Sequence, residues 1–315
     1  MPRYGACRPV NVRAVMMAYI KSKRFAWSWL IVATCFYAGL AGANTVRYPR
    51  LAGDSVRAAG FFDQGDLLRE ALRRSSPSTV LEAHEYTDAM SLSRVYTDVV
   101  EGKNVDVIWR TTTVARETDL LPVRIPIDKG LFGWRVAVIR DEDHDQFAKI
   151  KTREQLASKR GGVGFDWSDR TIMEANQLPL ETAPRGSLLF GMLNAKRFDY
   201  IPRSLAEIEG EAARYTELNL VPAPGFVIHY PSAMYFFVNR KKPELAEKIR
   251  LGLEAMIADG SFERDFRQRY AAVLHELQLK DRIVIELSNP TLPDATPLKR
   301  SALWFKPVTA GRAKR

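Results

Sequence analysis

One short segment combines a fixed positive charge with a helix-start signal. Arg203 directly precedes Ser204-Leu205-Ala206-Glu207, in which a Ser three residues before a Glu matches a capping box. The segment follows FDYIP, which has the pattern of a strand. Ligands bind where the strands of an open α/β sheet end, and the free N–H groups of a helix start favour an anion. Arg203 and Ser204 are therefore candidate ligand-binding residues. The alternative for Arg203 is an ion pair with Asp199 or a neighbouring acid.

Signals for catalysis are weak. The four histidines are scattered without metal-ligand spacing such as HExxH, and no serine lies in a GxSxG motif. The glycine cluster at 161–164 does not match a dinucleotide fingerprint. We therefore expect neither a cofactor nor a metal, and we expect that the protein is not an enzyme.

The chain begins with a segment typical of secreted proteins. A basic cluster at 21–24 precedes the apolar run FAWSWLIVATCFYAGLAGA at 25–43, which ends in a small-x-small exit. These are the marks of a cleaved signal peptide, residues 1–43. The alternatives are a membrane anchor, for which the run is short, and a lipid on Cys35. We expect a periplasmic protein that starts at Asn44.

Charge and cysteine content narrow the function classes. The leader holds six basic residues and no acid, so its removal leaves 41 basic and 37 acidic residues, a net charge of +4. A strong positive charge, the main argument for a nucleic-acid partner, is therefore absent from the chain after the leader. Both cysteines, Cys7 and Cys35, lie in the leader, which excludes a disulfide framework and a cysteine nucleophile from the mature protein.

The rest of the chain alternates strand-like and helical patterns. Strands are predicted at 44–49, 79–84, 105–109, 133–140, 162–165, 180–182 and 198–201, and helices at 67–74, 89–100, 170–176, 187–195, 243–259 and 261–274. Gly260 separates the last two helices as a left-handed cap. This alternation predicts an α/β fold with mainly parallel sheets covered by helices.

Four segments occur in an order that points to one family. They are NVDVIWRTTTVARETDLLPVRIPI (104–127), GLFGWRVAVI, RFDYIPRSLAEIEGE and SAMYFFVNRKKPELAEKIRLGLEAMIADGSFERDFRQRY. In this order, after a signal peptide, they resemble the periplasmic type II solute-binding proteins, in the amino-acid-binding branch that serves ABC importers. The resemblance covers most of residues 44–271.

The resemblance implies a fold of two α/β lobes that close on a ligand about a hinge. The first lobe would comprise residues 44–132 and 239–290, and the second lobe residues 133–238. The strands GWRVAVI and AMYFFVN would be the two hinge crossings. Residues 291–315 would form a C-terminal tail, loose at its basic end.

The resemblance also assigns roles to first-lobe residues. The segment from Thr113 to Arg116 resembles Thr-Pro-Glu-Arg of the family, in which the arginine binds a ligand carboxylate bidentately. Arg116 would take that role, or else form a surface salt bridge with Asp119 or Glu117. Thr111 and Thr112 would contact the ligand or simply finish the strand. Trp109 would be a stacking wall or a core residue.

The second lobe departs from the family pattern. The aspartate that holds an amino group in the family is replaced by Ser204, and Arg203 adds a positive charge beside it. We therefore expect a polar, anionic solute rather than an ordinary amino acid. The first loop is short, with Phe61 and Phe62 as aromatic candidates. Trp167 would face the ligand or pack inside the lobe.

The sequence is consistent with three classes of function. The expected one is a monomeric solute-binding protein that delivers its solute to a membrane permease. The second is a sensing or partner-binding module of the same fold, which would act with a membrane sensor. The third is a catalytic member of the fold, dehydratase- or transglycosylase-like, with Glu82, Asp166 or Asp169 as its acid.

The leader generates the first prediction. We expect the exported protein to start at or near Asn44, because signal peptidase cleaves after a small-x-small exit. N-terminal sequencing of protein from the periplasmic fraction measures this. An intact segment at 25–43 in the exported protein would favour the membrane anchor.

Overall fold

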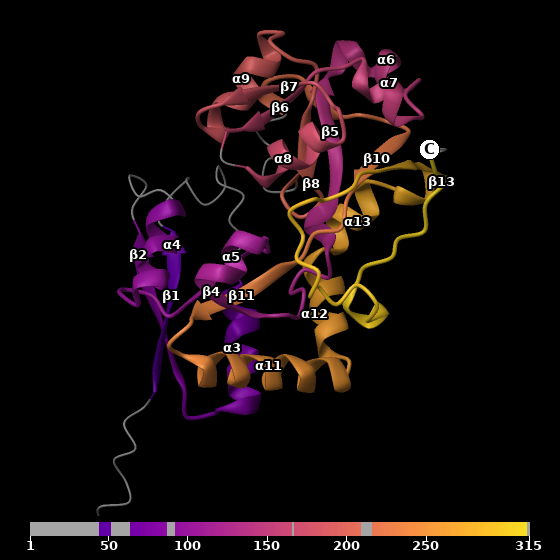
Figure 1. The fold of residues 1–315 in the computed structure, drawn as a ribbon. Coiled ribbons are helices and arrows are strands. Elements are labelled where there is room, and N and C mark those ends of the chain that lie inside the picture. Colours follow the sequence, from indigo (N-terminus) through magenta and orange to yellow (C-terminus); the bar gives the residue numbers. More distant parts are fainter. Residues whose placement is uncertain (1–43, 52–63, 87–91, 166, 209–215, 314–315) are drawn as a thin grey trace, which may run out of the picture. The chain divides into compact units, whose positions relative to one another are not determined.

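The computed structural model describes residues 44–51, 64–86, 92–165, 167–208 and 216–313. The predicted signal peptide and the aromatic pair Phe61 and Phe62 lie outside the described residues. Within Thr45–Arg315 the chain forms two α/β lobes, and each has its own buried apolar clusters (Figure 1).

The first lobe is organised around the strand β11 (Met234–Asn239). This strand is hydrogen-bonded to β3 (Val107–Thr111) on one side and to β4 (Leu120–Val123) on the other. A parallel pair, β1 (Thr45–Leu51) and β2 (Val80–Tyr86), packs beside β3. The sequence predicts four of these five strands to within a few residues, because each is a short β-branched or aromatic run.

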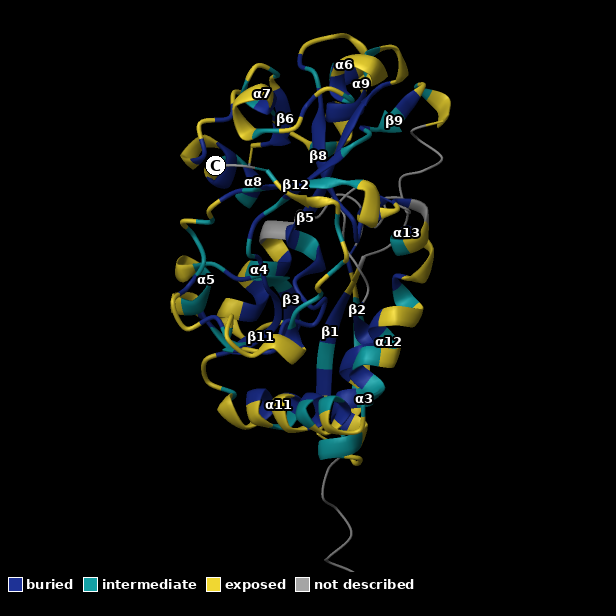
Figure 2. Cartoon of the chain, turned by 90° about the vertical axis from the view of Figure 1, so that its right-hand side faces the viewer, coloured by how far each residue is buried: buried dark blue, intermediate teal, exposed yellow. Residues whose placement is uncertain are grey.

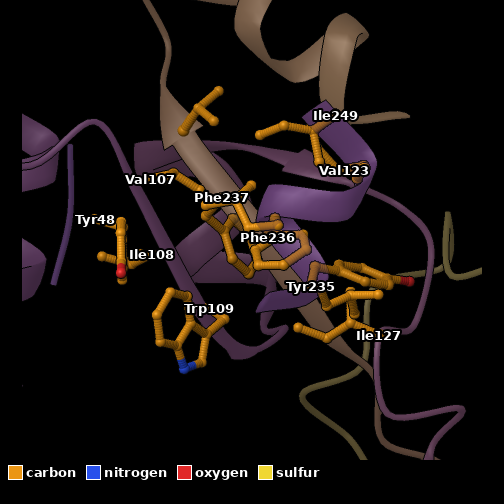
Figure 3. Packing of buried hydrophobic residues seen from close by; sticks show 14 of the residues in the cluster. Tyr48, Val107, Ile108, Trp109, Val123, Ile127, Tyr235, Phe236, Phe237 and Ile249 are labelled. Carbon is orange, nitrogen blue, oxygen red and sulfur yellow. The ribbon is translucent and has the colours of Figure 1, made fainter. Parts of the chain in front are cut away.

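Aromatic side chains fill the core of the first lobe. Figure 3 shows Trp109, Phe236 and Phe237 packed together with Tyr48 and Ile249. The Trp109 and Phe236 rings meet edge to face with their centroids 6.2 Å apart, a geometry that aromatic pairs favour. This core fixes the ends of β3 and β11. The first-lobe candidate residues Thr111, Thr112 and Arg116 lie at or just after the end of β3.

Two amphipathic helices cover the first lobe. α11 (Pro243–Ala258) lies against α3 (Gly65–Ser75), and both bury one apolar face (Figure 1). The buried residues of α11 recur at helical spacing, as the sequence predicts. The helix ends before Gly260, whose φ of 75° confirms the left-handed cap. The closest approach is at Gly252, where an added Cβ would lie 1.9 Å from the carbonyl oxygen of Ala71.

The second lobe is organised around β5 (Trp134–Arg140), which is buried along its whole length (Figure 2). Because side chains alternate along a strand, Val136 and Val138 enter one apolar cluster and Ala137 and Ile139 the other. The other strands of this lobe are β6 (Gly161–Gly164), β7 (Leu180–Ala183), β8 (Ile201–Ser204), β9 (Leu220–Pro222), β10 (Phe226–His229), β12 (Ile283–Glu286) and β13 (Gly311–Arg312).

Short helices connect the strands of both lobes. They are α4 (Leu92–Glu101), α5 (Val114–Asp119), α6 (His144–Phe147), α7 (Arg153–Ala157), α8 (Ser168–Ala175), α9 (Leu189–Asn194), α12 (Ser261–Arg269) and α13 (Ala271–Glu276), with 3-10 turns at Leu131–Gly133, Asp141–Asp143, Gly186–Leu188, Leu279–Asp281 and Ser301–Leu303. In the described part of the chain, no helix is long and apolar enough to cross a membrane.

The expectation of mainly parallel sheets needs a correction, because the three-stranded sheet of the first lobe is antiparallel and the six-stranded sheet of the second lobe is mixed. β1–β2, β6–β7, β10–β12 and β12–β13 are parallel pairs, whereas every antiparallel pair contains β5 or β11. These two strands are the ones the chain enters directly from the other lobe. A strand entered from the opposite side runs against its neighbours, which explains the mixed direction.

The connections between the lobes differ from the sequence expectation in their position. β5 lies wholly in the second sheet and β11 wholly in the first, so the crossings are the segments before them, residues 124–133 and 230–233. The two crossings run side by side. The Ile127 N–H donates to the Met234 carbonyl at 2.9 Å, and the Tyr230 N–H donates to the Gly133 carbonyl at 3.1 Å.

The chain after α11 does not stay with the first lobe. Phe262 packs in the first-lobe core, but Phe266 and Tyr270 on the same helix pack in a second-lobe cluster. β12 then joins β10 in the second sheet. Residues 261–286, which the resemblance places in the first lobe, therefore pass into the second. The reason is the apolar face of α12 and α13, which matches the cluster beside β5.

The contact at Gly252 generates a stability prediction. Gly252→Ala should lower the free energy of unfolding by about 1–3 kcal/mol, because the new methyl group has no space against the backbone of α3. Gly191→Ala in α9 is the matched control, since an added Cβ there meets nothing within 4 Å. The control should leave stability unchanged or raise it by about 0.5–1 kcal/mol. Urea denaturation of both variants measures this, and equal effects would contradict the packing.

Candidate functional site

Arg116 lies at the start of α5, directly after the end of β3. Thr113 caps the helix, and its hydroxyl accepts a hydrogen bond from the Arg116 N–H at 3.1 Å. The Arg116 guanidinium donates back to the carbonyl of Thr111 and lies 5.9 Å from the centre of the Tyr96 ring. A capped turn and an aromatic ring thus hold the side chain in one orientation.

The two acids expected to pair with Arg116 are engaged elsewhere. Glu117 accepts hydrogen bonds from Arg124 at 3.1 Å and from the Thr112 hydroxyl at 2.8 Å. Asp119 accepts a hydrogen bond from the Tyr96 hydroxyl at 2.7 Å. Among the described residues, the Arg116 guanidinium has no ion-pair partner.

The environment of Arg116 leaves donors available. Its Nε is buried without a hydrogen-bond partner in the described part of the chain. Burial lowers the pKa of Arg116, because a low-dielectric environment disfavours its charge. Such a guanidinium gains free energy when an anionic oxygen reaches it, because an unmade buried hydrogen bond is costly.

The neighbouring candidates on β3 have structural partners. Thr112 is 3% exposed and donates its hydroxyl to Glu117, while its N–H donates to the Ala233 carbonyl at 2.7 Å. Thr111 is half-buried, and its carbonyl is used by Arg116. Trp109 is 2% exposed within the first-lobe core, which favours the core alternative over the stacking wall. Arg116 is the first-lobe candidate with unused hydrogen-bonding capacity.

The predicted helix start at Ser204 takes a different form. Ser204 is the last residue of β8, and a turn follows it. One of the two side-chain bonds of a capping box is present, since Glu207 accepts from the Ser204 N–H at 3.2 Å. The Ser204 hydroxyl accepts from the Ala206 N–H at 3.1 Å instead of from the Glu207 N–H. The N–H groups of this turn, which were predicted to bind an anion, are therefore already hydrogen-bonded inside the protein.

Arg203 forms an ion pair with a neighbouring acid, which was the predicted alternative to ligand binding. The acid is Glu207 and not Asp199. Its Nη2 lies 3.2 Å from the Glu207 carboxylate, and the Arg203 side chain is 3% exposed. The guanidinium also lies 4.8 Å over the Trp167 ring, within the range of a cation–π contact. The positive charge of Arg203 is therefore balanced inside the second lobe.

Trp167 lies between glycine backbone and this guanidinium. An added Cβ on Gly164 would lie 2.5 Å from the indole Nε1, and one on Gly186 would lie 2.8 Å from Cζ2. Both glycines thus permit close contact between the backbone and the ring. Trp167 packs against two apolar clusters of the second lobe, and this supports the packing alternative for its role.

A buried ion network lies beside Arg203 and includes residues that sequence reasoning missed. Arg135 donates to Asp169 at 3.1 Å, to Glu207 at 3.2 Å and to the Tyr230 hydroxyl at 2.7 Å. The Tyr230 hydroxyl in turn donates to Asp169 at 2.6 Å. A signal was present in the sequence, because Arg135 is a charged residue within the apolar strand GWRVAVI.

The network shifts the pKa values of two of its members, Arg135 and Tyr230. Burial acts to lower the pKa of Arg135, but the nearby charges of Asp169 and Glu207 and the dipole of Tyr230 offset it, so its pKa is raised. Burial also raises the pKa of Tyr230 well above its usual value. Among the described residues, each of the two arginines, Arg135 and Arg203, thus lies beside at least one carboxylate, as buried charges require.

The candidate residues thus form two groups. Thr111, Thr112 and Arg116 lie together at the end of β3, with Trp109 in the core beneath them. Trp167, Arg203 and Ser204 lie together around the ion network of the second lobe. No group of three His, Cys, Asp or Glu side chains suited to a metal ion occurs among the residues that the structure describes.

Comparison with known proteins supports this architecture. No protein-family model matches the sequence, and no curated protein sequence matches it. Among solved structures, the probable amino-acid ABC transporter extracellular-binding protein YtmK of Bacillus subtilis aligns with a TM-score of 0.53 and 17% identity, over 72% of this chain and 98% of its own. An ancestral arginine-binding protein bound to glutamine aligns with a TM-score of 0.50 and 18% identity, over 71% and 97%. This likeness confirms the two-lobed solute-binding-protein fold.

The ion network generates a second stability prediction. Arg135→Met should lower the free energy of unfolding by about 3–5 kcal/mol, because it leaves two buried carboxylates without their shared partner. Arg153→Met is the control, since Arg153 forms only a solvent-exposed pair with Glu154 and should not change the midpoint. Chemical denaturation compares them. A small effect at Arg135 would mean that water or other groups solvate the acids.

Proposed function

We propose that this protein is an extracytoplasmic binding protein that closes on a small solute carrying a carboxylate. The observation that carries the proposal is Arg116, a guanidinium oriented by Thr111 and Tyr96, without a carboxylate partner among the described residues. A carboxylate can take two hydrogen bonds from an arginine side chain. The confirmed fold, in which the lobes of a binding protein close about a hinge, supports this role.

The structure supports a less negatively charged solute than the one expected from the sequence. Arg203 was to supply a second positive charge, but Glu207 neutralises it. The neighbouring ancestral protein is bound to glutamine, a solute with one carboxylate and no net charge. A single free guanidinium requires only a single carboxylate. We therefore propose a solute with a single carboxylate, such as an amino acid, in place of a solute that bridges two arginines.

Binding rather than catalysis fits the acids of the second lobe. Asp169, one of the residues considered as a catalytic acid, is 3% exposed and accepts hydrogen bonds from Arg135 and Tyr230. Glu207 is held by Arg135 and Arg203. Both carboxylates are thus engaged in structural contacts inside the lobe, which favours a binding protein over an enzyme that uses them. The proposed partners are the solute and a membrane permease, and the proposed location is the periplasm.

Arg116 generates the binding prediction. A thermal-shift screen with L-glutamine, L-arginine and simple monocarboxylates would first identify a solute, because a ligand of the native state raises the midpoint. Arg116→Ala should then weaken binding of that solute roughly tenfold to a hundredfold, since a charge-assisted hydrogen bond contributes about 1.5–3 kcal/mol. Isothermal titration calorimetry measures the change.

Two controls separate binding from folding. Arg69→Ala removes an exposed first-lobe arginine that pairs with Asp66, and it should leave the affinity unchanged. Arg203→Ala should lower the thermal midpoint by removing a partner of Glu207, with little effect on the affinity. Equal affinities of wild type and Arg116→Ala for a confirmed solute would reject the proposed role of Arg116.

A further inference from the structure

The C-terminal tail that the sequence places at 291–315 is packed against both lobes at Leu303–Phe305, just before its basic end. Leu303 is fully buried in the first-lobe core, and Trp304 packs against the same core. The next residue, Phe305, packs against a second-lobe cluster, with its ring centroid 5.5 Å from that of Phe266. Adjacent residues of one segment are thus anchored in different lobes. We refer to residues 287–305 as the strap.

The beginning of the strap joins the second lobe to the second crossing. Ser288 exchanges hydrogen bonds with the Asn176 side chain, which follows α8: its N–H donates to Oδ1 at 2.9 Å and its carbonyl accepts from Nδ2 at 2.8 Å. Asn289 Nδ2 then donates to the carbonyl of Pro231 at 2.8 Å. Pro231 belongs to the crossing at 230–233, so the strap contacts one of the two hinge segments here.

The strap next reaches the helix that carries Arg116. The carbonyl of Thr291 accepts a hydrogen bond from the Val114 N–H at 3.2 Å, and Val114 is the first residue of α5. Asn289 fixes Thr291 in place, because its Oδ1 accepts from the Thr291 N–H at 3.0 Å and from the Thr291 hydroxyl at 2.8 Å. One side chain, Asn289, therefore holds both a hinge crossing and the contact with α5.

The end of the strap joins the first crossing. The Phe305 N–H donates to the carbonyl of Lys129 at 2.7 Å, and Lys129 Nζ donates to the carbonyl of Ala302 at 2.9 Å. Lys129 belongs to the crossing at 124–133. Arg300 forms a bidentate pair with Glu254 of α11 at 2.6 Å, which adds a contact with the first lobe.

These contacts differ in strength. The anchor at Leu303–Phe305 buries apolar side chains in both lobes, and it lies at a crossing, where a hinge rotation displaces atoms least. The Thr291–Val114 contact is a single backbone hydrogen bond and depends on one polar side chain. If the lobes move apart, the Thr291–Val114 contact breaks first.

We propose that the strap is a hinge brace with a releasable latch: Leu303–Phe305 forms the pivot, and Asn289 and Thr291 form the latch that ties α5 to the second lobe. Opening of the lobes then requires release of the Val114 N–H from Thr291. This inference does not depend on the identity of the solute or on the role of Arg116 in binding it.

The latch is testable without a ligand. Asn289→Ala in the mature chain should increase amide hydrogen exchange at Val114 by roughly 3- to 10-fold, because the latch loses the side chain that orders Thr291. Asp294→Ala is the matched control on the same strap, at an exposed position, and should exchange like wild type. Equal exchange at Val114 in all three proteins would overturn the latch.

A distance measurement tests the brace directly. The mature chain contains no cysteine, so spin labels can be placed at exposed Glu101 in the first lobe and Asp145 in the second. The inter-label distance distribution of Asn289→Ala should be broader and longer than that of wild type, and that of Asp294→Ala should match wild type. An unchanged distribution in Asn289→Ala would overturn the brace.

A more conservative variant tests the same contact if Asn289→Ala folds poorly. Asn289→Asp retains the acceptor for Thr291 but loses the donor to Pro231. We expect it to keep Val114 protected from exchange and to leave the distance distribution like that of wild type, because the acceptor that orders Thr291 is retained. Exchange at Val114 that rises together with a global loss of protection would show that Asn289 only stabilises the fold, and would reject the latch.

Discussion

The buried guanidinium of Arg135 is the interaction on which the second lobe depends. A charge that is 1% exposed is tolerated only when opposite charges and hydrogen bonds surround it. Asp169 at the start of α8, Glu207 after β8 and Tyr230 after β10 supply them. One side chain on β5 therefore fixes the positions of three other elements, and the apolar clusters on the two faces of β5 pack around that arrangement.

This constraint also decides where the protein can offer charge to a ligand. Glu207 serves both Arg135 and Arg203, and Trp167 lies under the Arg203 guanidinium, so the second lobe carries a balanced set of charges. The first lobe is different. The acids near Arg116 are bound by Arg124 and Tyr96, which leaves the guanidinium with unused donors among the described residues. The two lobes thus differ in charge: the second is internally balanced, and the first keeps a guanidinium with unused donors among the described residues.

The route of the chain between the lobes shapes how they can move. β5 and β11 run antiparallel to their neighbours because the chain enters each of them from the opposite lobe. The two crossings are hydrogen-bonded to each other, and the C-terminal segment contacts both of them, at Pro231 and at Lys129. Three segments of chain thus meet at the connection between the lobes: two cross between them, and the third is hydrogen-bonded to both crossings.

The sequence by itself determined what depends on near neighbours. The apolar spacing in α3 and α11, the left-handed cap at Gly260 and several short strands were all predicted, because each is set by residues within one or two turns. The order of four such segments was enough to predict the two-lobed fold.

Only the tertiary structure decided how residues far apart in the sequence are paired. Arg135 and Tyr230 are 95 positions apart, and Lys129 and Ala302 are 173 apart. No local pattern indicates that Trp109 is buried, or that Leu303 and Phe305 pack in different lobes. Burial and charge pairing are properties of the packed lobes, since the dielectric environment and the available partners exist only after distant elements have met.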